Sequence, residues 1–474
     1  MLFNSMQFVL FFAAVVLLYF SMPFRFRWIL LLAASYYFYM CWNVKYLILI
    51  ILSTLVDYVA SRCMESLSKP KRKKYLFASL LTNLGLLFAF KYFNFFSSSL
   101  NQLFDSLQMP VQIPFFNVLL PVGISFYTFQ TLSYTIDVYR GKIPVERNLG
   151  IFALYVAFFP QLVAGPIERA ANLLPQFRQN NLFDDQRVVS GLRLILWGFF
   201  KKLVVADRLA LYVDAVYSNT DIHSGLTLLI ATYFFAFQIY CDFSGYSDIA
   251  IGSARVLGYR LMTNFDRPYF SLNIQEFWHR WHISLSTWFK DYLYIPLGGS
   301  RVAVPRMYFN LMTVFVVSGL WHGANWTFVF WGGLHGVYHI LSRLTLGFRD
   351  RAAQKMHFPG AWIRLSRILI TFHLVCFSWI YFRADSLQSA NHIVGKIFTL
   401  HGEGLYISAL DQFVYGLLAI AILCMLDGLQ EHYRLTSRPL QFPTLVRWCG
   451  YLLLSVIIVL MGVFNGSQFI YFQF

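Results

Sequence analysis

Long apolar segments recur along the whole chain, and each is about as long as a helix that crosses a membrane. The first covers about Met6 to Ser21, and the last covers Trp448 to Phe464. Roughly 20 apolar residues in helical conformation span a bilayer, whereas a membrane β-strand needs only about ten residues of alternating polarity. The runs show no alternation of that kind. The pattern therefore predicts an all-α, polytopic membrane protein.

The composition agrees with this prediction. Of the 474 residues, 58% are hydrophobic and 13% are charged, and the mean hydropathy is +0.55. A soluble domain carries about 25% charged residues. The net charge of +16 does not indicate nucleic-acid binding, because the basic residues lie between apolar runs, where the positive-inside bias places them. We expect membrane lipid, and no nucleic acid, around the chain.

Two loops set the expected orientation. The segment 61–74 holds six basic residues and one Glu, while 97–114 holds no Lys or Arg. Basic loops stay in the cytoplasm, so both termini are expected on the outer, periplasmic side. The first apolar run has no basic segment before it and no small-residue cleavage site. We therefore expect a retained helix there and not a signal peptide.

We expect a single transmembrane domain over residues 1–474, with about twelve spans and one or two re-entrant or interfacial pieces. The segment 149–190 is an apolar half-helix followed by a Pro/Gly break, which is typical of a re-entrant element. The expected spans are Met6–Ser21, Trp28–Trp42, Tyr46–Ala60, Tyr75–Phe96, Val118–Val138, Val188–Val205, Leu226–Ile251, Met307–Leu320, Trp326–Leu341, Ile363–Tyr381, Leu410–Leu426 and Trp448–Phe464.

A histidine-rich stretch between Gln275 and His339 is the leading candidate for a functional site. An ionisable group costs roughly 2.5 kcal/mol or more near the bilayer centre, so such residues are not gathered there without a use. Residues 274–297 carry too many charges to face lipid, and we expect one amphipathic helix at the cytoplasmic interface or dipping inward. The five histidines of the stretch are His279, His282, His322, His335 and His339.

On such a helix His279 and His282 would share a face, because they are three residues apart. The tryptophans Trp278, Trp281 and Trp288 would then anchor the helix at the membrane surface. His335 and His339 have the i,i+4 spacing of a metal-binding pair, but HGVYH lacks the Glu of HExxH. The six cysteines are scattered singly. We therefore expect no metal site.

His322 lies at the end of an apolar run, in GLWHGAN. The flanking Gly319 and Gly323 allow another backbone or a ligand to approach closely. A neutral imidazole in a water-poor site can accept the proton of a hydroxyl nucleophile, which is general-base catalysis. The alternative is a histidine that is hydrogen-bonded between helices.

Other polar groups in apolar surroundings allow two interpretations each. Asp242 and Tyr246 in CDFSGYSD either orient a histidine or join helix to helix, and the structural role is favoured. Lys201 and Lys202 either meet phosphates or snorkel to the cytoplasmic surface, with snorkelling slightly favoured. The aromatic tail 465–474, NGSQFIYFQF, either anchors at the membrane surface or enters a cavity and presents Tyr471.

Several of these segments resemble one family. EFWHRWHISLSTWFKDYLYIPLGG, GLWHGANWTF, PVGISFYTFQ, CDFSGYSD and VAGPIER resemble segments of the membrane-bound O-acyltransferases, and the likeness runs from the first residues to the last. The branch that the chain resembles is that of the alginate O-acetylation proteins, with the teichoic-acid D-alanyl transferases more distant. The resemblance implies helices around a central tunnel and a catalytic core at about 115–345.

The resemblance also implies a reaction. Acetyl would pass from acetyl-CoA, a donor substrate and not a cofactor, across the bacterial inner membrane. A periplasmic SGNH-type serine acetyltransferase would then pass it to an exopolysaccharide. The resemblance assigns His322 as catalytic base, His282 as the second catalytic histidine and Tyr471 as acyl acceptor. The implied lining of the tunnel or donor site is Trp281, Ser284, Asp291, Trp321, Asn325, Asp242 and Tyr246.

Two other functions stay open at this point. One is a transporter or flippase that moves an acyl donor or a glycan with no chemistry of its own, although no internal repeat is visible to support it. The other is an acyltransferase of the same fold that acts on teichoic acid, peptidoglycan or a protein.

Overall fold

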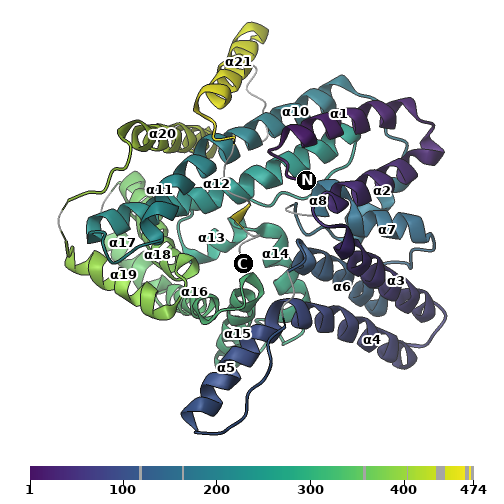
Figure 1. Cartoon of the computed structure of the whole chain (residues 1–474), viewed down its shortest axis with the longest axis horizontal. Helices are drawn as coiled ribbons and strands as arrows, with labels where there is room; N and C mark the ends of the chain where they lie inside the picture. The colour runs from purple at the N-terminus through teal and green to yellow at the C-terminus, as the bar shows by residue number, and fades with distance from the viewer. Residues whose placement is uncertain are drawn as a thin grey trace. The chain divides into compact units, whose positions relative to one another are not determined.

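The computed structural model describes residues 1–116, 120–162, 165–355, 359–402, 404–433, 443–464 and 469–470. Within these ranges every regular element is a helix (Figure 1), so the prediction of an all-helical, polytopic membrane protein is confirmed. The expected total of about twelve spans includes shorter apolar helices such as α1 (Met6–Ser21). Among the described residues, six helices are long and apolar enough to cross a membrane: Val44–Met64, Lys69–Ser106, Gly225–Leu257, Gly360–Arg383, Leu410–Glu431 and Thr444–Met461.

The chain divides into two compact units. Unit 1 comprises Met1–Ile195 and Ile249–Met262, and unit 2 comprises Leu196–Asp248 and Thr263–Phe474. The catalytic core expected at about 115–345 contributes residues to both units. The helices that begin in unit 1 are α1 (Met6–Ser21), α2 (Phe24–Met40), η1 (Val44–Tyr46), α3 (Leu47–Met64), α4 (Lys69–Leu87), η2 (Phe88–Tyr92), α5 (Phe93–Ser106), α6 (Ile124–Arg140), α7 (Leu149–Ala157), α8 (Phe159–Leu162), α9 (Ala170–Leu173), η3 (Leu174–Arg178) and α10 (Asp185–Phe199).

A buried carboxylate joins α3 to α4 in unit 1. Asp57 is fully buried and accepts hydrogen bonds from Ser79 Oγ at 2.5 Å and from Asn83 Nδ2 at 2.9 Å. The amide oxygen of Asn83 in turn accepts from Ser53 Oγ at 2.6 Å. A carboxylate away from water must be hydrogen-bonded, so these polar residues fix how the two helices pair.

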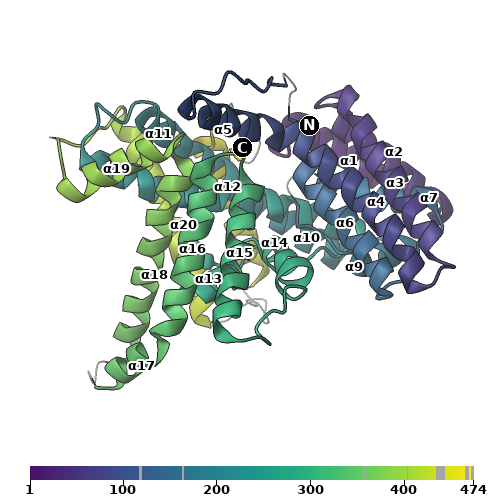
Figure 2. The same cartoon turned by 90° about the horizontal axis from the view of Figure 1, so that it is seen from below.

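One expectation for unit 1 changes, and two others can be compared with the helices that the structure describes. The loop expected at 97–114 begins only after α5, because the helix continues through the π-helical segment η2 and bends there (Figures 1 and 2); such segments are common sites of kinks. The span expected at 118–138 corresponds to α6, and residues 117–119 lie outside the described part. The expected half-helix after residue 149 is confirmed as α7, which ends at Ala157.

Unit 2 contains the remaining helices. They are η4 (Phe200–Ala206), α11 (Asp207–Tyr217), α12 (Gly225–Leu257, which continues into unit 1), η5 (Pro268–Phe270), α13 (Ile274–Arg280), α14 (Ile283–Phe289), η6 (Lys290–Tyr294), α15 (Val304–His322), α16 (Trp326–Leu344), α17 (Leu346–Lys355), α18 (Gly360–Arg383), α19 (Leu387–Thr399), α20 (Leu410–Tyr433) and α21 (Thr444–Met461).

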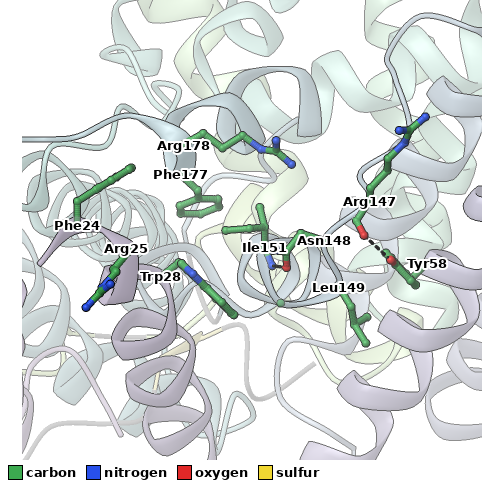
Figure 3. Close-up of a pocket in the computed structure, with 11 residues that line it drawn as sticks. Phe24, Arg25, Trp28, Tyr58, Arg147, Asn148, Leu149, Ile151, Phe177 and Arg178 are labelled. Atoms are coloured by element: carbon green, nitrogen blue, oxygen red, sulfur yellow. Dashed lines mark hydrogen bonds between the residues drawn. The ribbon is translucent and has the colours of Figure 1, made fainter.

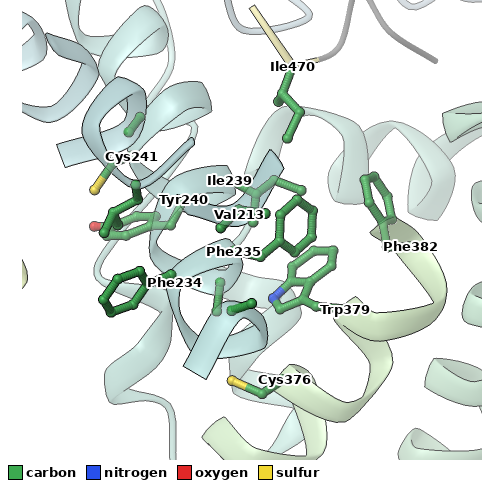
Figure 4. Close-up of a cluster of buried hydrophobic side chains, with 14 of the residues drawn as sticks. Val213, Phe234, Phe235, Ile239, Tyr240, Cys241, Cys376, Trp379, Phe382 and Ile470 are labelled. Carbon is green, nitrogen blue, oxygen red and sulfur yellow. The ribbon is translucent and has the colours of Figure 1, made fainter. Parts of the chain in front are cut away.

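The core of unit 2 is a large cluster of buried apolar side chains. Figure 4 shows Phe235 of α12 beside Trp379 of α18, and Ile239 of α12 and Val213 of α11 belong to the same cluster. Ile470, from the end of the chain, belongs to the same cluster and points toward Ile239. Burying a side chain of this size contributes about 1.5–3 kcal/mol, so this cluster holds α11, α12 and α18 together.

Two helices of unit 2 pack unusually closely. α15, α16 and α18 run side by side (Figure 2). A Cβ added at Gly319 would lie 2.2 Å from the Phe328 carbonyl oxygen, and one at Gly332 would lie 2.2 Å from the Phe315 carbonyl oxygen. The close approach expected at Gly319 is therefore confirmed as backbone packing of α15 against α16.

Two expected helices are interrupted. The helix expected at 188–205 is α-helical only to Phe199 and then widens into the π-helix η4. The single helix expected at 274–297 is wrong: α13 ends at Arg280, and α14 starts at Ile283 after His282, whose φ of 44° is left-handed. A non-Gly residue with positive φ is uncommon, and it marks a turn.

Candidate active site

His322 is the last residue of α15 and is buried in an aromatic environment. α15 ends there because Gly323 takes an extended conformation. The His322 ring centroid lies 5.0 Å from that of Trp321, 5.1 Å from that of Trp331 on α16 and 5.6 Å from that of Phe382 on α18. Three helices of unit 2 therefore place this imidazole among apolar rings, where electrostatic interactions are stronger than in water.

His282 lies next to His322, and the two ring centroids are 6.4 Å apart. The break between α13 and α14 turns His282 into the interior, where it is fully buried, while His279 on α13 is exposed. The expectation that these two histidines share a helical face is therefore wrong. The structure instead pairs His282 with His322, the two catalytic candidates.

Asn264 fixes the proton position on His282. Its amide oxygen lies 3.1 Å from His282 Nδ1 and accepts from Ser284 Oγ at 2.9 Å, while its Nδ2 donates to Ser247 Oγ at 3.2 Å. Because an amide oxygen only accepts, we assign the proton to Nδ1 and the lone pair to Nε2. Burial lowers the pKa of His282 to about 3, so the ring is neutral at physiological pH.

Sequence reasoning missed Asn264. It lies in the connection between α12 and η5, far from either histidine in sequence, and a single Asn in a loop carries no spacing signal. Ser284, an expected lining residue, is part of the same network, because it donates to Asn264 through both Oγ and its backbone N–H.

His335 has a different role. Its Nδ1 lies 3.3 Å from Trp278 Nε1, which donates to it, and its Nε2 lies 2.8 Å from Ser378 Oγ. Both ring nitrogens therefore join α13, α16 and α18, which is a structural function. Among the described residues no three His, Cys, Asp or Glu side chains are grouped so that they could hold a metal ion.

Lys202 lies at the centre of a buried ion-pair cluster. Its Nζ is 2.7 Å from Asp207 Oδ1 and 2.8 Å from Asp242 Oδ1, and Lys201 pairs with Asp248. Lys202 is fully buried, so the expectation of snorkelling is wrong. A Cβ at Gly245 would lie 2.9 Å from the Gly198 carbonyl oxygen at the end of α10 and 3.1 Å from the Lys202 backbone nitrogen in η4; this close approach brings α12 and its Asp242 against η4.

The end of the chain reaches this cluster. The backbone N–H of Ile470 donates to Asp242 Oδ2 at 2.7 Å. The Phe469 ring centroid lies 4.5 Å from that of Tyr246 and 5.6 Å from that of Phe243, which is 4.6 Å from His282. Tyr471, the expected acyl acceptor, lies outside the described residues.

Two expected lining residues are tryptophans near the histidines. Trp321 lies 6.0 Å from His282, measured between ring centroids. Trp281 packs 5.5 Å from Phe277 and 5.1 Å from Trp379. Trp281 and Trp288 are both buried within unit 2, so the expectation that they anchor the chain at the membrane surface is wrong.

The remaining lining candidates lie in other surroundings. Asn325 caps α16, since its Oδ1 accepts from Thr327 N at 3.0 Å, and its Nδ2 donates to the Asp385 carbonyl. Asp291 lies in η6 and is partly exposed. The structure therefore places Ser284, Trp321, Asp242 and Tyr246 close to the histidines or the tail, and gives Asn325 a capping role.

Unit 1 has a separate cavity of about 870 Å³. Arg25, Arg147 and Arg178 lie at its rim, and Phe177 lies beside Ile151 (Figure 3). Arg147 and Arg178 pair with Glu65 and Glu146. None of the residues singled out in the sequence as catalytic or lining candidates lines this cavity.

Comparisons with known proteins agree with these motifs. The chain is 41% identical to a probable alginate O-acetylase of Azotobacter vinelandii, over 84% of this chain and 78% of the relative. It is 37% identical to a peptidoglycan O-acetyltransferase of Helicobacter pylori, over 79% of this chain and 74% of the relative. A teichoic acid D-alanyltransferase of Bacillus subtilis is 26% identical over 56% of this chain and 69% of the relative.

The sequence model of the membrane-bound O-acyltransferase family matches residues 76–384, a range that includes His282 and His322. Together with the apolar helices of both units, this match establishes a multi-pass membrane protein with an acyltransferase ancestry. The chain belongs to the membrane-bound O-acyltransferase family.

Proposed function

We propose that this chain is an O-acetyltransferase of the bacterial inner membrane, which takes acetyl from cytoplasmic acetyl-CoA for the O-acetylation of a polysaccharide outside the cytoplasm. Relatives named alginate O-acetylase and peptidoglycan O-acetyltransferase support this substrate class. The observation that carries the proposal is the buried pair of His282 and His322, 6.4 Å apart between ring centroids.

His322 is the proposed general base. It removes the proton from an acceptor hydroxyl as the oxygen attacks the thioester carbonyl; the C–O bond forms, the C–S bond breaks, and the CoA thiolate leaves and takes that proton from the His322 imidazolium. General-base catalysis contributes about 10²–10⁴-fold. His282 can accept a hydrogen bond at Nε2, and its proposed role is to stabilise the imidazolium that forms on His322.

Tyr471 is the proposed first acceptor. Its neighbour Ile470 donates a hydrogen bond to Asp242, and Phe469 packs against Phe243, which in turn packs against His282. Both contacts support a position of the tail near His282. An acetyl-tyrosine formed there would pass its acetyl group to a periplasmic SGNH-type serine acetyltransferase, which acetylates the exopolysaccharide.

Labelled acetyl-CoA tests the function. The purified chain in vesicles is given radiolabelled acetyl-CoA, and label is followed on the protein, on added SGNH partner and on polysaccharide. The proposal predicts alkali-labile label in the C-terminal peptide of wild type and of Tyr451→Phe, a control that removes one hydroxyl from α21, and none in Tyr471→Phe. Transport of intact acetyl-CoA or glycan with no acyl transfer would contradict the proposal.

A further inference from the structure

The segment that follows α21 is fastened to η4 and its ion-pair cluster at two points. The backbone N–H of Val463 donates to the Leu203 carbonyl oxygen at 3.1 Å. Seven residues later, the N–H of Ile470 donates to Asp242 Oδ2 at 2.7 Å. A hydrogen bond from a backbone N–H to a carboxylate is charge-assisted and about twice as strong as a neutral one.

The two carboxylates around Lys202 are not equivalent. Lys202 Nζ lies 2.8 Å from Asp242 Oδ1, so Oδ2 of the same carboxylate is directed to Ile470. Asp207 lies 2.7 Å from Lys202, yet within the described residues it makes no hydrogen bond to the tail. The pair of Asp242 and Lys202 is therefore the part of the cluster that contacts the C-terminal segment.

Side-chain packing adds to this attachment. Phe469 is fully buried and Ile470 is 3% exposed, with Ile470 in the main apolar cluster (Figure 4). The Tyr246 ring contacts both Lys202 and Phe469. Lys202 Nζ is 5.4 Å from the Tyr246 ring centroid, and the Phe469 ring centroid is 4.5 Å from it. Asp242 and Tyr246 of α12 thus contact the two tail residues, and Lys202 of η4 contacts both of these α12 side chains.

We propose that Asp242, held in place by Lys202, is a tether that positions the C-terminal segment beside His282. Its ligand is the backbone N–H of Ile470 in the same chain. Asp242 and Lys202 are positioning residues in this account, with no contact to reacting atoms required. The attachment of the tail to Asp242 does not depend on the proposed function. Only its purpose rests on that proposal, which assigns the acceptor hydroxyl to the tail.

The tether is tested by trimming the C-terminus of the full chain with a carboxypeptidase and following the products by mass spectrometry. In wild type we expect trimming to stop before Ile470. Loss of one charge-assisted hydrogen bond corresponds to about a 10- to 100-fold change, and we expect Asp242→Asn to lose Ile470 faster by that factor. Asp207→Asn, which also removes a carboxylate from Lys202, is expected to trim like wild type.

A second pair of variants leaves the ion-pair cluster of Lys202, Asp207 and Asp242 unchanged. Ile470→Pro removes the N–H donor and Ile470→Ala keeps it, so only the proline variant is expected to release the tail as Asp242→Asn does. Equal trimming of Asp207→Asn and Asp242→Asn, or of the two Ile470 variants, would overturn the tether. If released variants keep full acetyl transfer at unchanged kcat, the tether stands and the tail's role in the proposed function fails.

Discussion

Asn264 determines which nitrogen of His282 carries the lone pair, and it does so with one amide oxygen shared between the imidazole and Ser284. A neutral Asn is suited to this task, because it orients the ring without adding a charge that would favour the imidazolium. The pair of histidines therefore depends on a residue that neither of them adjoins in sequence.

The contact between Asn264 and His282 can be tested by the pH dependence of acetyl transfer in an Asn264→Asp variant. A carboxylate 3.1 Å from Nδ1 raises the pKa of His282 from its lowered value, because it favours the charged ring. Below that raised pKa the ring is protonated at Nε2 and cannot accept a hydrogen bond. We expect acid inhibition of acetyl transfer to begin at higher pH in Asn264→Asp than in wild type, measured between about pH 5 and 8.

Ser247→Ala is the control for that variant, since it removes the acceptor of the Asn264 Nδ2 hydrogen bond with no change of charge. Its pH profile should match that of wild type. Superimposable profiles for wild type and Asn264→Asp would mean that Asn264 does not act on His282.

At single residues, the sequence predicted the histidines better than their partners. The burial of His322 was predictable from its place at the end of an apolar run, and its catalytic role, inferred from the cost of burying an ionisable group, stays a prediction. The partners of Lys202 were not identifiable in the same way. Asp242 is 40 positions away in sequence, and only the close packing at Gly245 brings it to the lysine.

At the scale of helices, two adjacent glycines on α16 offer a matched comparison. A Cβ at Gly332 would lie 2.2 Å from the Phe315 carbonyl oxygen, whereas a Cβ at Gly333 has no atom within 4 Å. We expect Gly332→Ala to lower the free energy of unfolding by about 1–3 kcal/mol, because the backbones of α15 and α16 must separate. Gly333→Ala should be neutral or stabilising by up to about 1 kcal/mol.

Thermal unfolding in detergent, with helicity as the signal, distinguishes the two variants. A Gly332→Ala protein that melts at the wild-type temperature would show that α15 and α16 do not pack as described.

Most helix positions followed from the length of the apolar runs, but the interruptions did not. The break at His282 lies inside a stretch whose polar and apolar residues continue the helical pattern. The widening at η4 lies inside an expected span at Lys201 and Lys202, and no proline or glycine within Phe200–Ala206 marks it. Both irregularities depend on tertiary partners: the carbonyl of Asn264 accepts from Ile283 N at 2.9 Å, and the carbonyl of Leu203 accepts from Val463 N.

For the whole molecule, the charge difference between loops predicts the direction of insertion. Single cysteines at Lys73, before the fourth apolar run, and at Met109, after α5, test it in a background without native cysteines. Both positions are exposed. We expect Lys73→Cys to react with a membrane-impermeant reagent only from the cytoplasmic side and Met109→Cys only from the periplasmic side. Reaction of both from one side would contradict the expected topology.

The most direct test of the account is the rate of acetyl transfer in a His322→Ala variant, measured beside His335→Ala at one acetyl-CoA concentration. Both changes remove a buried imidazole next to Trp331, but only His322 is the proposed base. We expect His322→Ala to lose about 10²–10⁴-fold in rate while it stays folded. His335→Ala should lose stability, by about 1–3 kcal/mol, and keep most of its rate per folded molecule. A folded His322→Ala protein that transfers acetyl at the wild-type rate would contradict the account.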